Sequence, residues 1–250
     1  MSAARSSPVA LVTGGSGGIG SAIGRRLAEA GMRVLLTYNT NRSGAESVLA
    51  SLAGNGHGAV QLALDRSDGT DQLVERLGSE YGRLDLLVNN AGFTRAVPHD
   101  DLDGLNDELI DQIFRVNWRG AFATVRATRD LLRSDGGGTI VNISSIAGRT
   151  GMGSNIAYCA SKAALDSMTR SLARALAPEI RVVSVAPGLV AGDYAAQLPA
   201  QFVSAQEAHT PLQRIAQPQD VAEAVYAAAF HLRFTTGDII AVDGGRPLGS

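Results

Sequence analysis

A tyrosine and a lysine, Tyr158 and Lys162, are the residues of this chain whose types and spacing most clearly suggest chemistry. On a helix, a spacing of four places both side chains on one face. A free phenol has a pKa of about 10, and a neighbouring ammonium stabilises the phenolate and lowers that pKa. The pair could therefore exchange a proton with a substrate at neutral pH, although many helices carry a tyrosine and a lysine at this spacing by chance.

A glycine-rich segment, Thr13 to Gly20, follows the first apolar run of the chain and opens a helical pattern. Glycines there let the backbone turn tightly and approach a pyrophosphate, whose charge is stabilised by free N–H groups at the start of a helix. An ordinary flexible turn is the alternative. The strand before the segment and the helix after it favour a dinucleotide-binding loop.

The elements that must position these residues alternate along the chain. Short, almost continuously apolar runs predict strands that are buried on both faces, and they cover Val9–Thr13, Val34–Thr37, Ala59–Leu64, Leu84–Val88, Thr139–Ile143, Arg181–Val185 and Asp238–Val242. Amphipathic stretches of helical length lie between them, at Ile19–Ala30, Asp68–Tyr81, Leu105–Arg133, Ala157–Ala177 and Pro218–His231. This alternation predicts a single domain over residues 1–250, in which a doubly wound parallel seven-stranded sheet carries helices on both faces.

Composition excludes several other classes of protein. The 250 residues are 45% hydrophobic, and 22 basic residues nearly balance 24 acidic ones, so nothing in the net charge favours nucleic acid or an anionic membrane as a partner. The single cysteine, Cys159, excludes an internal disulfide and is typical of a reducing cytosol. No apolar run is long enough to cross a membrane and no secretory leader is recognisable, so we expect a soluble cytoplasmic protein. The four histidines are scattered without ligand spacing, and we expect no metal site.

Further motifs agree in order and separation with one known family. They are Asp65, Asn89-Asn90-Ala91-Gly92, Asn117, Ser145, Pro187-Gly188 and Asp243-Gly244-Gly245, together with the glycine loop and the Tyr158/Lys162 pair. With these motifs the chain resembles the classical short-chain dehydrogenase/reductase family over nearly its whole length. The resemblance implies a Rossmann-type fold and hydride transfer between a nicotinamide cofactor and a carbonyl or alcohol carbon.

The resemblance also assigns roles to residues of the site. Tyr158 would donate the proton in reduction, and Ser145 would stabilise the growing charge on the carbonyl oxygen. Lys162 would bind the nicotinamide ribose and lower the pKa of Tyr158. Asn117 would hold a water that relays protons to Lys162, and a local distortion of its helix is the alternative. The residues expected to bind the cofactor are Gly14, Ser16, Gly17, Gly18, Ile19, Gly20, Asn39, Thr40, Arg42, Asp65, Asn90, Ala91, Gly92, Tyr158, Lys162, Pro187, Gly188 and Val190.

The segment after the second expected strand indicates which nicotinamide cofactor is used. An acidic residue there typically holds the ribose 2′-hydroxyl of NAD, whereas a 2′-phosphate needs donors and no nearby carboxylate. Residues 37–42 contain no acid, and Asn39, Thr40 and Arg42 could supply amide, hydroxyl and guanidinium groups. We therefore predict NADP, with NAD as the alternative because Gly17 stands where many NADP-preferring relatives carry a basic residue. For Arg42 in particular, a solvated polar loop is the other interpretation.

Two positions depart from the family pattern, Val183 in place of a common Asn and Gly192 in place of a common Thr. The second departure removes a hydroxyl expected to contact the cofactor phosphates. Residues 188–210 are the least regular stretch of the chain, and we expect them to form a mobile segment over the substrate.

The chain is similar to the 3-oxoacyl carrier-protein reductase branch of the family, so we expect NADP-dependent ketone reduction. An alcohol or sugar dehydrogenase working in the oxidative direction is the alternative among enzymes, and a nucleotide-binding regulator without activity is the alternative of another class. The family usually forms tetramers or dimers, so a homo-oligomer is expected. Three arginines at helical spacing could bind an acidic carrier protein, although a solvated helix face or a subunit contact explains them better; they are Arg126, Arg129 and Arg133.

Overall fold

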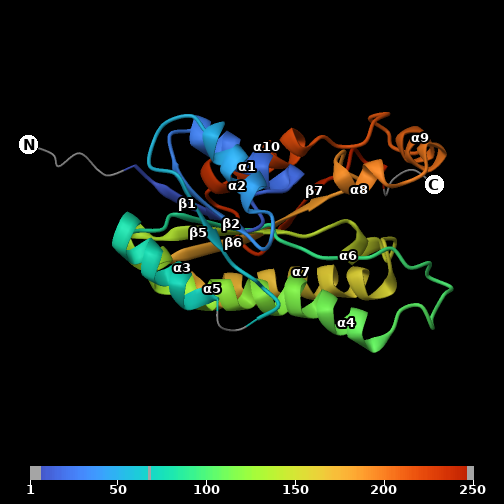
Figure 1. Ribbon diagram of the computed structural model, residues 1–250, viewed down its shortest axis with the longest axis horizontal. Helices are drawn as coiled ribbons and strands as arrows, with labels where there is room; N and C mark the ends of the chain where they lie inside the picture. Colours follow the sequence, from blue (N-terminus) through green and yellow to red (C-terminus); the bar gives the residue numbers. More distant parts are fainter. Residues whose placement is uncertain (1–6, 67–68, 247–250) are drawn as a thin grey trace, which may run out of the picture.

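The computed structural model describes residues 7–66 and 69–246. Its seven strands are all parallel and form one sheet in the order β3-β2-β1-β4-β5-β6-β7. Figure 1 shows this sheet as a middle layer, with α1, α2 and α10 on one face and α3, α4, α5 and α7 on the other. The expected Rossmann-type fold is therefore confirmed. The strands are β1 (Val9–Val12), β2 (Arg33–Tyr38), β3 (Gly58–Gln61), β4 (Leu86–Asn89), β5 (Gly138–Ile143), β6 (Ile180–Pro187) and β7 (Ile239–Val242).

The helices fill the connections between the strands. The α-helices are α1 (Gly18–Glu29), α2 (Arg42–Ala50), α3 (Thr70–Arg76), α4 (Asp107–Phe114), α5 (Ala121–Arg133), α6 (Ala147–Thr150), α7 (Ile156–Leu176), α8 (Asp193–Ala196), α9 (Ala200–Ala208) and α10 (Pro218–Phe230). Two π-helices, η1 (Leu77–Tyr81) and η2 (Arg115–Gly120), and a 3₁₀-helix, η3 (Ser134–Gly136), complete them. Among the described residues, no helix is both long and apolar enough to cross a membrane.

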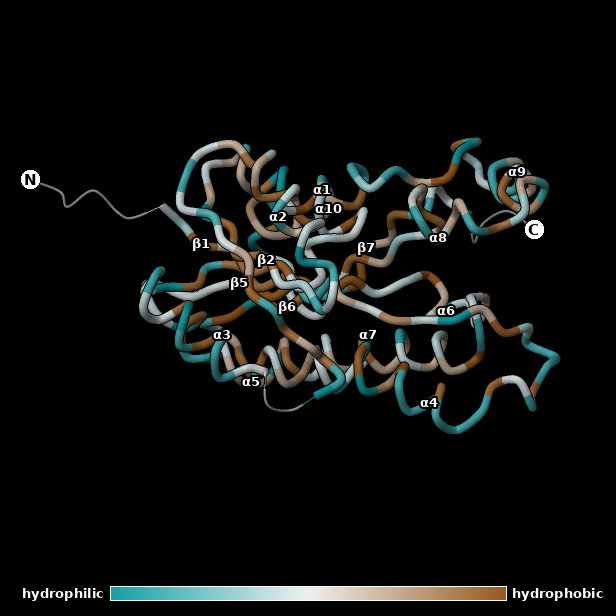
Figure 2. Tube along the Cα trace, in the orientation of Figure 1, coloured by the Kyte–Doolittle hydropathy of each residue, from teal (hydrophilic) through white to brown (hydrophobic). Residues whose placement is uncertain are grey.

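Side chains that alternate along each strand feed two separate cores. In β1, Ala10 and Val12 pack on the side of α1 and α10, whereas Val9 and Leu11 pack on the side of α3, α5 and α7. All four are fully buried. Figure 2 shows the apolar residues gathered between the layers and the polar ones on the outer surfaces of the helices. Burial on both faces explains why these strands are almost continuously apolar.

Three differences from the expected elements have local causes. Helix α2 was not expected, and it begins after Asn41, whose side chain accepts a hydrogen bond from the Gly44 N–H at 2.9 Å. The helix expected over 105–133 begins later, because Asn106 caps it, and it is interrupted by η2. The stretch 188–210 is more regular than expected, since it contains α8 and α9.

The strand order places a crevice between β1 and β4. These two strands are neighbours in the sheet, although the chain leaves them toward opposite edges. In open α/β sheets, ligands bind outside the carboxyl ends of the strands at such a switch point. The glycine loop follows β1 and Asn90-Ala91-Gly92 follows β4, so the fold brings both motifs to this crevice.

Candidate active site

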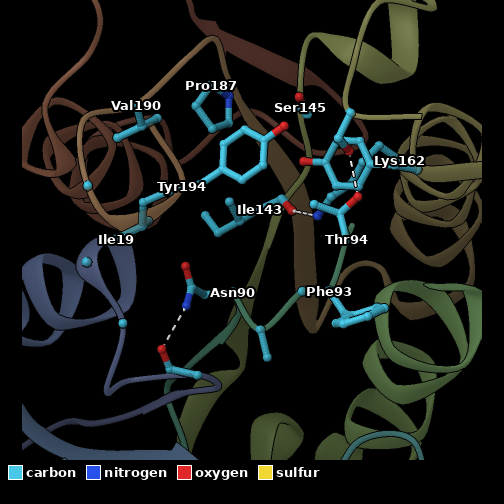
Figure 3. A pocket seen from close by; sticks show the side chains of 18 of the residues that line it. Ile19, Asn90, Phe93, Thr94, Ile143, Ser145, Lys162, Pro187, Val190 and Tyr194 are labelled. Carbon is cyan, nitrogen blue, oxygen red and sulfur yellow. Dashed lines mark hydrogen bonds between the residues drawn. The ribbon is translucent and has the colours of Figure 1, made fainter. Parts of the chain in front are cut away.

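One continuous cavity of about 1030 Å³ runs along the carboxyl ends of the strands. Nearly all of the residues expected to act in binding or catalysis line it, and Figure 3 shows side chains from several strand ends facing this space. Those lining it are Gly14, Ser16, Gly17, Gly18, Ile19, Gly20, Asn39, Thr40, Asp65, Asn90, Ala91, Gly92, Ser145, Tyr158, Lys162, Pro187, Gly188 and Val190. Two expected residues, Arg42 and Asn117, do not line it.

The glycine loop is held in place by the motif that follows β4. The Asn90 side-chain amide donates to the carbonyl oxygens of Thr13 at 2.9 Å and Gly14 at 3.2 Å. Gly14 has a φ of 67°, and a Cβ there would lie 3.0 Å from the Ala91 Cα. Asn90 and Ala91 therefore shape the loop, in addition to the contact with a cofactor that the sequence suggested.

The start of α1 leaves the backbone groups that an anion needs. Its N-cap is Gly17, which has no side chain to bond the first amides, and its first turn carries no acidic residue. A Cβ at Gly17 or Gly18 would meet no atom closer than 3.8 Å, so the approach from the cavity is open. Unpaired N–H groups at the positive end of a helix favour a phosphate, and the loop therefore fits a dinucleotide.

Tyr158 lies in the first turn of α7 and is positioned by the helix cap. Asn155 accepts a hydrogen bond from the Tyr158 N–H at 2.7 Å, and its amide donates to the Arg95 carbonyl at 2.7 Å. Burial raises the pKa of Tyr158 to about 12, and a hydrogen bond with the Ser145 side chain opposes this rise. The phenol therefore keeps its proton at neutral pH and is close enough to Ser145 for both hydroxyls to reach one oxygen.

Lys162 is almost fully buried, with 4% of its surface exposed. Its ammonium donates to the Ile143 carbonyl at 2.8 Å, as Figure 3 shows. Burial lowers the pKa of Lys162 to about 8, although the negative charge of Asp166 acts to raise it. Asp166 is itself buried one turn further along α7, and its Oδ1 has no hydrogen-bond partner among the described residues. The sequence analysis did not identify Asp166.

The expected lowering of the Tyr158 pKa by Lys162 is not what this geometry produces. The Lys162 Nζ lies 5.7 Å from the centre of the Tyr158 ring, and it is engaged by a backbone carbonyl. Loss of water around the phenol is the larger effect, so its pKa rises. The expectation considered only the spacing of the pair, whereas the protein buries Lys162 and partly buries Tyr158.

Asn117 lies inside η2 and is buried. Its Oδ1 accepts from the Phe93 N–H at 2.7 Å, and its Nδ2 donates to the Phe93 carbonyl and the Ser161 hydroxyl, both at 3.0 Å. The side chain is thus fully used in joining three elements where a helix is distorted, which agrees with the structural alternative. A Cβ on Gly92 would lie 3.4 Å from Asn117 Oδ1 and 3.6 Å from Lys162 Nζ, so Asn117 borders the site. The water relay remains a prediction.

The opposite end of the cavity is formed by residues at the end of β2 and directly after it. Thr37, within the strand, lines this end together with Asn39, Thr40 and Asn41. Arg42 instead begins α2, and its Nε donates to Glu46 Oε1 at 2.8 Å in an exposed i,i+4 pair. The unrecognised helix is the reason for this difference, because it turns Arg42 toward its own helix surface.

The structure shows the surroundings of the two residues that depart from the family pattern, Val183 and Gly192. Val183 is fully buried in the core beneath α1 and α10. Gly192 precedes α8 with a φ of 144° and provides no side-chain cap. A residue with a side chain would be strained at that φ, so glycine at this position suits the observed backbone.

The remaining wall comes from α8, α9 and the end of the chain. Tyr194, Leu198, Phe202 and Gln206 line the cavity from 188–210, and Figure 3 shows the Tyr194 ring facing this space. Arg246, after β7, also lines it and was not identified from the sequence. The sequence near Arg246 does not indicate a binding role, because only the parallel order of the strands brings the residues after β7 to this edge of the sheet.

Comparisons with known proteins agree with this geometry. The family model described as enoyl-(acyl carrier protein) reductase matches residues 14–246. A protein named as ketoacyl reductase 2 of the granaticin polyketide synthase, from Streptomyces violaceoruber, is 40% identical over 96% of both chains. Cis-4-hydroxycyclohexanecarboxylate dehydrogenase from Sinomonas cyclohexanicum is 37% identical over 95% of both. A structure from Burkholderia xenovorans assigned as a short-chain dehydrogenase/reductase has a TM-score of 0.91 and 34% identity, covering 98% of this chain and 100% of that one.

The chain belongs to the short-chain dehydrogenase/reductase family. It is therefore an oxidoreductase of the class that uses nicotinamide nucleotides. In this short-chain dehydrogenase/reductase, the cavity joins the glycine loop to the tyrosine, serine and lysine that the motifs predicted.

Burial of Lys162 has a consequence for stability that can be measured. Its folded pKa of about 8 lies below the ordinary 10.5. Between these values the unfolded chain binds more protons, so the free energy of unfolding rises with pH. The free energy of unfolding of the wild type, relative to that of Lys162→Met, should therefore increase by about 2 kcal/mol between pH 8 and pH 10. Urea unfolding of both proteins at pH 7.5, 9 and 10 measures this difference, and a difference independent of pH would show that Lys162 is not desolvated.

Proposed function

We propose that this enzyme reduces a ketone with NADPH, using Tyr158 as the proton donor. The observation that carries the proposal is the Tyr158 phenol, protonated at neutral pH and close to Ser145, in the same cavity as an open phosphate-binding loop. When bound, the reduced nicotinamide supplies hydride to the carbonyl carbon.

The residues of the chain handle the charge and the proton of this reaction. As negative charge develops on the carbonyl oxygen, the hydroxyls of Tyr158 and Ser145 stabilise it more than they stabilise the ground state. Tyr158 then transfers its proton to that oxygen. Lys162 keeps a positive charge below about pH 8, and its Nζ, 5.7 Å from the centre of the Tyr158 ring, is placed to bind the nicotinamide ribose as the family resemblance implies. Solvent must return the proton, and Asn117 borders the route that the family resemblance assigns to it.

A 3-oxoacyl thioester is the substrate class that we favour. Ketoacyl reduction is named for the Streptomyces relative, and the 36% identical protein from Synechocystis sp. is named 3-oxoacyl-(acyl carrier protein) reductase. The Sinomonas relative is named as a dehydrogenase of a ring alcohol, which keeps oxidation as the alternative. Oxidation needs a phenolate as the base, whereas burial raises the pKa of Tyr158 to about 12, so at neutral pH the phenol is in the protonated form that ketone reduction needs.

The ribose end of the cavity supports NADP as the cofactor. Asn39, Thr40 and Asn41 line it and none of these three carries a carboxylate, and they lie next to the positive N-terminal end of α2. The variant Asn39→Asp would place a negative charge against the 2′-phosphate. We expect its kcat/KM for NADPH to fall about 100-fold, while the value for NADH is kept or rises.

Arg42→Ala is the matched comparison for Asn39→Asp, because Arg42 is paired with Glu46 outside the cavity. We expect its kcat/KM for either nucleotide to change by less than about threefold. A large fall in kcat/KM with NADPH, but not with NADH, would instead show that Arg42 contacts the 2′-phosphate as the sequence suggested.

A panel of ketones assayed with NADPH and NADH in parallel tests the proposed function. It should contain acetoacetyl-CoA, acetoacetyl-N-acetylcysteamine, simple cyclic ketones and the corresponding alcohols. Oxidation of NADPH with a 3-oxoacyl thioester supports the proposal. Turnover confined to alcohols would favour the dehydrogenase, and tight nucleotide binding without turnover of any compound would favour a regulator.

Assembly, coverage of the substrate and location complete the proposal. We infer a homo-oligomer, a dimer or tetramer, and the apolar side chains Leu232 and Phe234, exposed between α10 and β7, support a contact near the last strand. The segment 188–210 contributes ten residues to the cavity wall, which supports its role as a covering segment that moves when substrate binds. A cytoplasmic location stays a prediction.

A further inference from the structure

The order of the strands separates the two ends of the cavity. Asn39 follows β2, Ser145 follows β5 and Arg246 follows β7, which is the edge strand opposite β3. Arg246 therefore lies beyond the reacting hydroxyls as seen from the nucleotide loop. Adjacent strands lie about 4.8 Å apart, so the ends of β5 and β7 are separated by about 10 Å before the reach of the arginine is considered. That span suits a small ring or a chain of a few carbons.

The Arg246 guanidinium is half-buried, and no other described side chain forms a hydrogen bond or an ion pair with it. Within residues 7–66 and 69–246, no hydrogen bond or ion pair involves its side chain. Burial lowers its pKa and the charge of Asp243 raises it, and an arginine keeps its positive charge throughout the ordinary pH range. A desolvated cation of this kind is stabilised by an anionic partner.

Neighbouring charges do not cancel that of Arg246. Asp243 Oδ1 accepts from the Gly245 N–H at 2.9 Å, and its Oδ2 lies 3.8 Å from the Arg149 guanidinium, so its charge is shared. Arg214 is matched by Asp220 through contacts of 2.6 and 2.9 Å. The cluster of Arg149, Asp243 and Arg246 therefore keeps a net positive charge at this end.

Among the described residues that line the cavity, Arg246 is the cation left without a partner and therefore available to a ligand. Of the described residues that line the cavity, the acids are Asp65, after β3, and Asp193, at the exposed start of α8. Lys162 is engaged by the Ile143 carbonyl, and His99 contacts the Gly153 carbonyl at 3.1 Å.

The cavity wall formed by the segment after β6, the strand next to β7, is mainly apolar. Tyr194 lines it from α8, Phe202 from α9 and Leu198 from the turn between these helices. Gln206 and Arg246 both border the cavity and a small adjoining space. A ligand that fits this end has an apolar body and an acceptor group at its far end, where an amide and a guanidinium can both donate to it.

We propose that Arg246 binds a carboxylate of the substrate, so that the enzyme prefers oxo acids whose ketone and carboxylate lie at opposite ends of an apolar body. The proposal rests on the ketone reduction proposed above and names free oxo acids as substrates in place of the 3-oxoacyl thioesters favoured there, because a thioester carries no carboxylate. A carboxylate matches the planar fork of a guanidinium through two parallel hydrogen bonds. The phosphates of a carrier arm share this anionic chemistry, and the experiment separates the two.

The turnover test compares 4-oxocyclohexanecarboxylate with its methyl ester, which has the same ring and ketone without the charge. For Arg246→Met, kcat/KM for the acid should fall about 10- to 100-fold, the size of a lost charged hydrogen bond, mainly through KM. The value for the ester should stay within about threefold of the wild type. For Arg246→Lys, kcat/KM for the acid should lie between the values of the wild type and Arg246→Met, because lysine keeps the charge but cannot donate two parallel hydrogen bonds. Arg129→Met, which removes an exposed arginine paired with Asp130 outside the cavity, should change neither value by more than about threefold.

A binding test gives a readout that does not depend on turnover. In the presence of saturating NADPH, cyclohexanecarboxylate should bind the wild type at least about tenfold more tightly than the neutral cyclohexanecarboxamide. Calorimetric titration should show that Arg246→Met removes this preference. NADPH affinity, measured by fluorescence titration, should be the same in both proteins.

The outcomes separate failure of this inference from failure of the proposed function. Equal binding of acid and amide by a wild type that reduces ketones would overturn the role of Arg246 alone. A carboxylate preference that depends on Arg246, in a protein that reduces no ketone, would support the site and count against the proposed reaction. Weaker NADPH binding by Arg246→Met would assign the arginine to the cofactor and overturn the inference. If Arg246→Met lost activity with acetoacetyl-CoA alone, and kept it with acetoacetyl-N-acetylcysteamine and 4-oxocyclohexanecarboxylate, Arg246 would bind the phosphates of the carrier arm. This outcome would overturn the proposed carboxylate site.

Discussion

Tyr158→Phe is expected to lower kcat for ketone reduction by about a thousandfold, while NADPH binding changes by less than about threefold. The substitution removes the proton donor and one of the two hydroxyls that face the carbonyl oxygen. The phenyl ring keeps the shape of the wall, and the Asn155 cap contacts only the backbone N–H of this residue. Steady-state turnover and fluorescence titration with NADPH measure the two effects separately.

Tyr194→Phe is the matched control, because Tyr194 places a second phenol in the same cavity. Burial raises its pKa and a hydrogen bond with Ser154 acts in the opposite direction, so its hydroxyl is already occupied. We expect its kcat to remain within about tenfold of the wild type. Near-complete loss of activity in Tyr194→Phe, together with retained activity in Tyr158→Phe, would show that Tyr194 and not Tyr158 donates the proton.

The sheet and the place of most expected site residues around the cavity could be predicted, because the local sequence pattern and the overall fold agree there. Runs such as Val9–Val12 are apolar on both faces, and only a strand covered by helices on both sides buries them. Most expected site residues stand directly after strands, and a parallel sheet brings all of those positions to one edge. For such residues, sequence position and place in space are nearly equivalent.

Other features depend on contacts between distant segments, and the sequence carries only weak signals for them. Helix α2 could have been found from the capping residue Asn41, but Gly44 in its first turn weakened the helical pattern. The π-helix at Asn117 follows from bonds to Phe93 and Ser161, which lie far away in the chain. The raised pKa of Tyr158 follows from burial, a property that spacing does not show.

Gly20→Ala should nearly abolish NADPH binding, because this position has no room for a side chain. A Cβ there would lie 2.3 Å from the Gly14 carbonyl oxygen and 2.6 Å from Asn90 Nδ2. Neither group can move freely, since Asn90 Nδ2 bonds the carbonyls of Thr13 and Gly14 and thereby holds the phosphate loop. The loop and α1 must separate, which should weaken NADPH binding at least about 100-fold and lower the free energy of unfolding by about 1–3 kcal/mol.

Gly24→Ala, one turn later in α1, tests whether the effect is specific to the loop. A Cβ on Gly24 would lie 3.1 Å from Leu36 Cδ2, the far end of a flexible side chain, and Gly24 does not line the cavity. Alanine also favours a helix by about 1 kcal/mol over glycine, which offsets the small displacement of Leu36. NADPH affinity of this variant should stay within about threefold of the wild type, because the loop geometry is unchanged. Wild-type affinity in Gly20→Ala would show that the phosphates do not depend on the close approach of α1 to Gly14, and the dinucleotide would then have to bind elsewhere in the cavity.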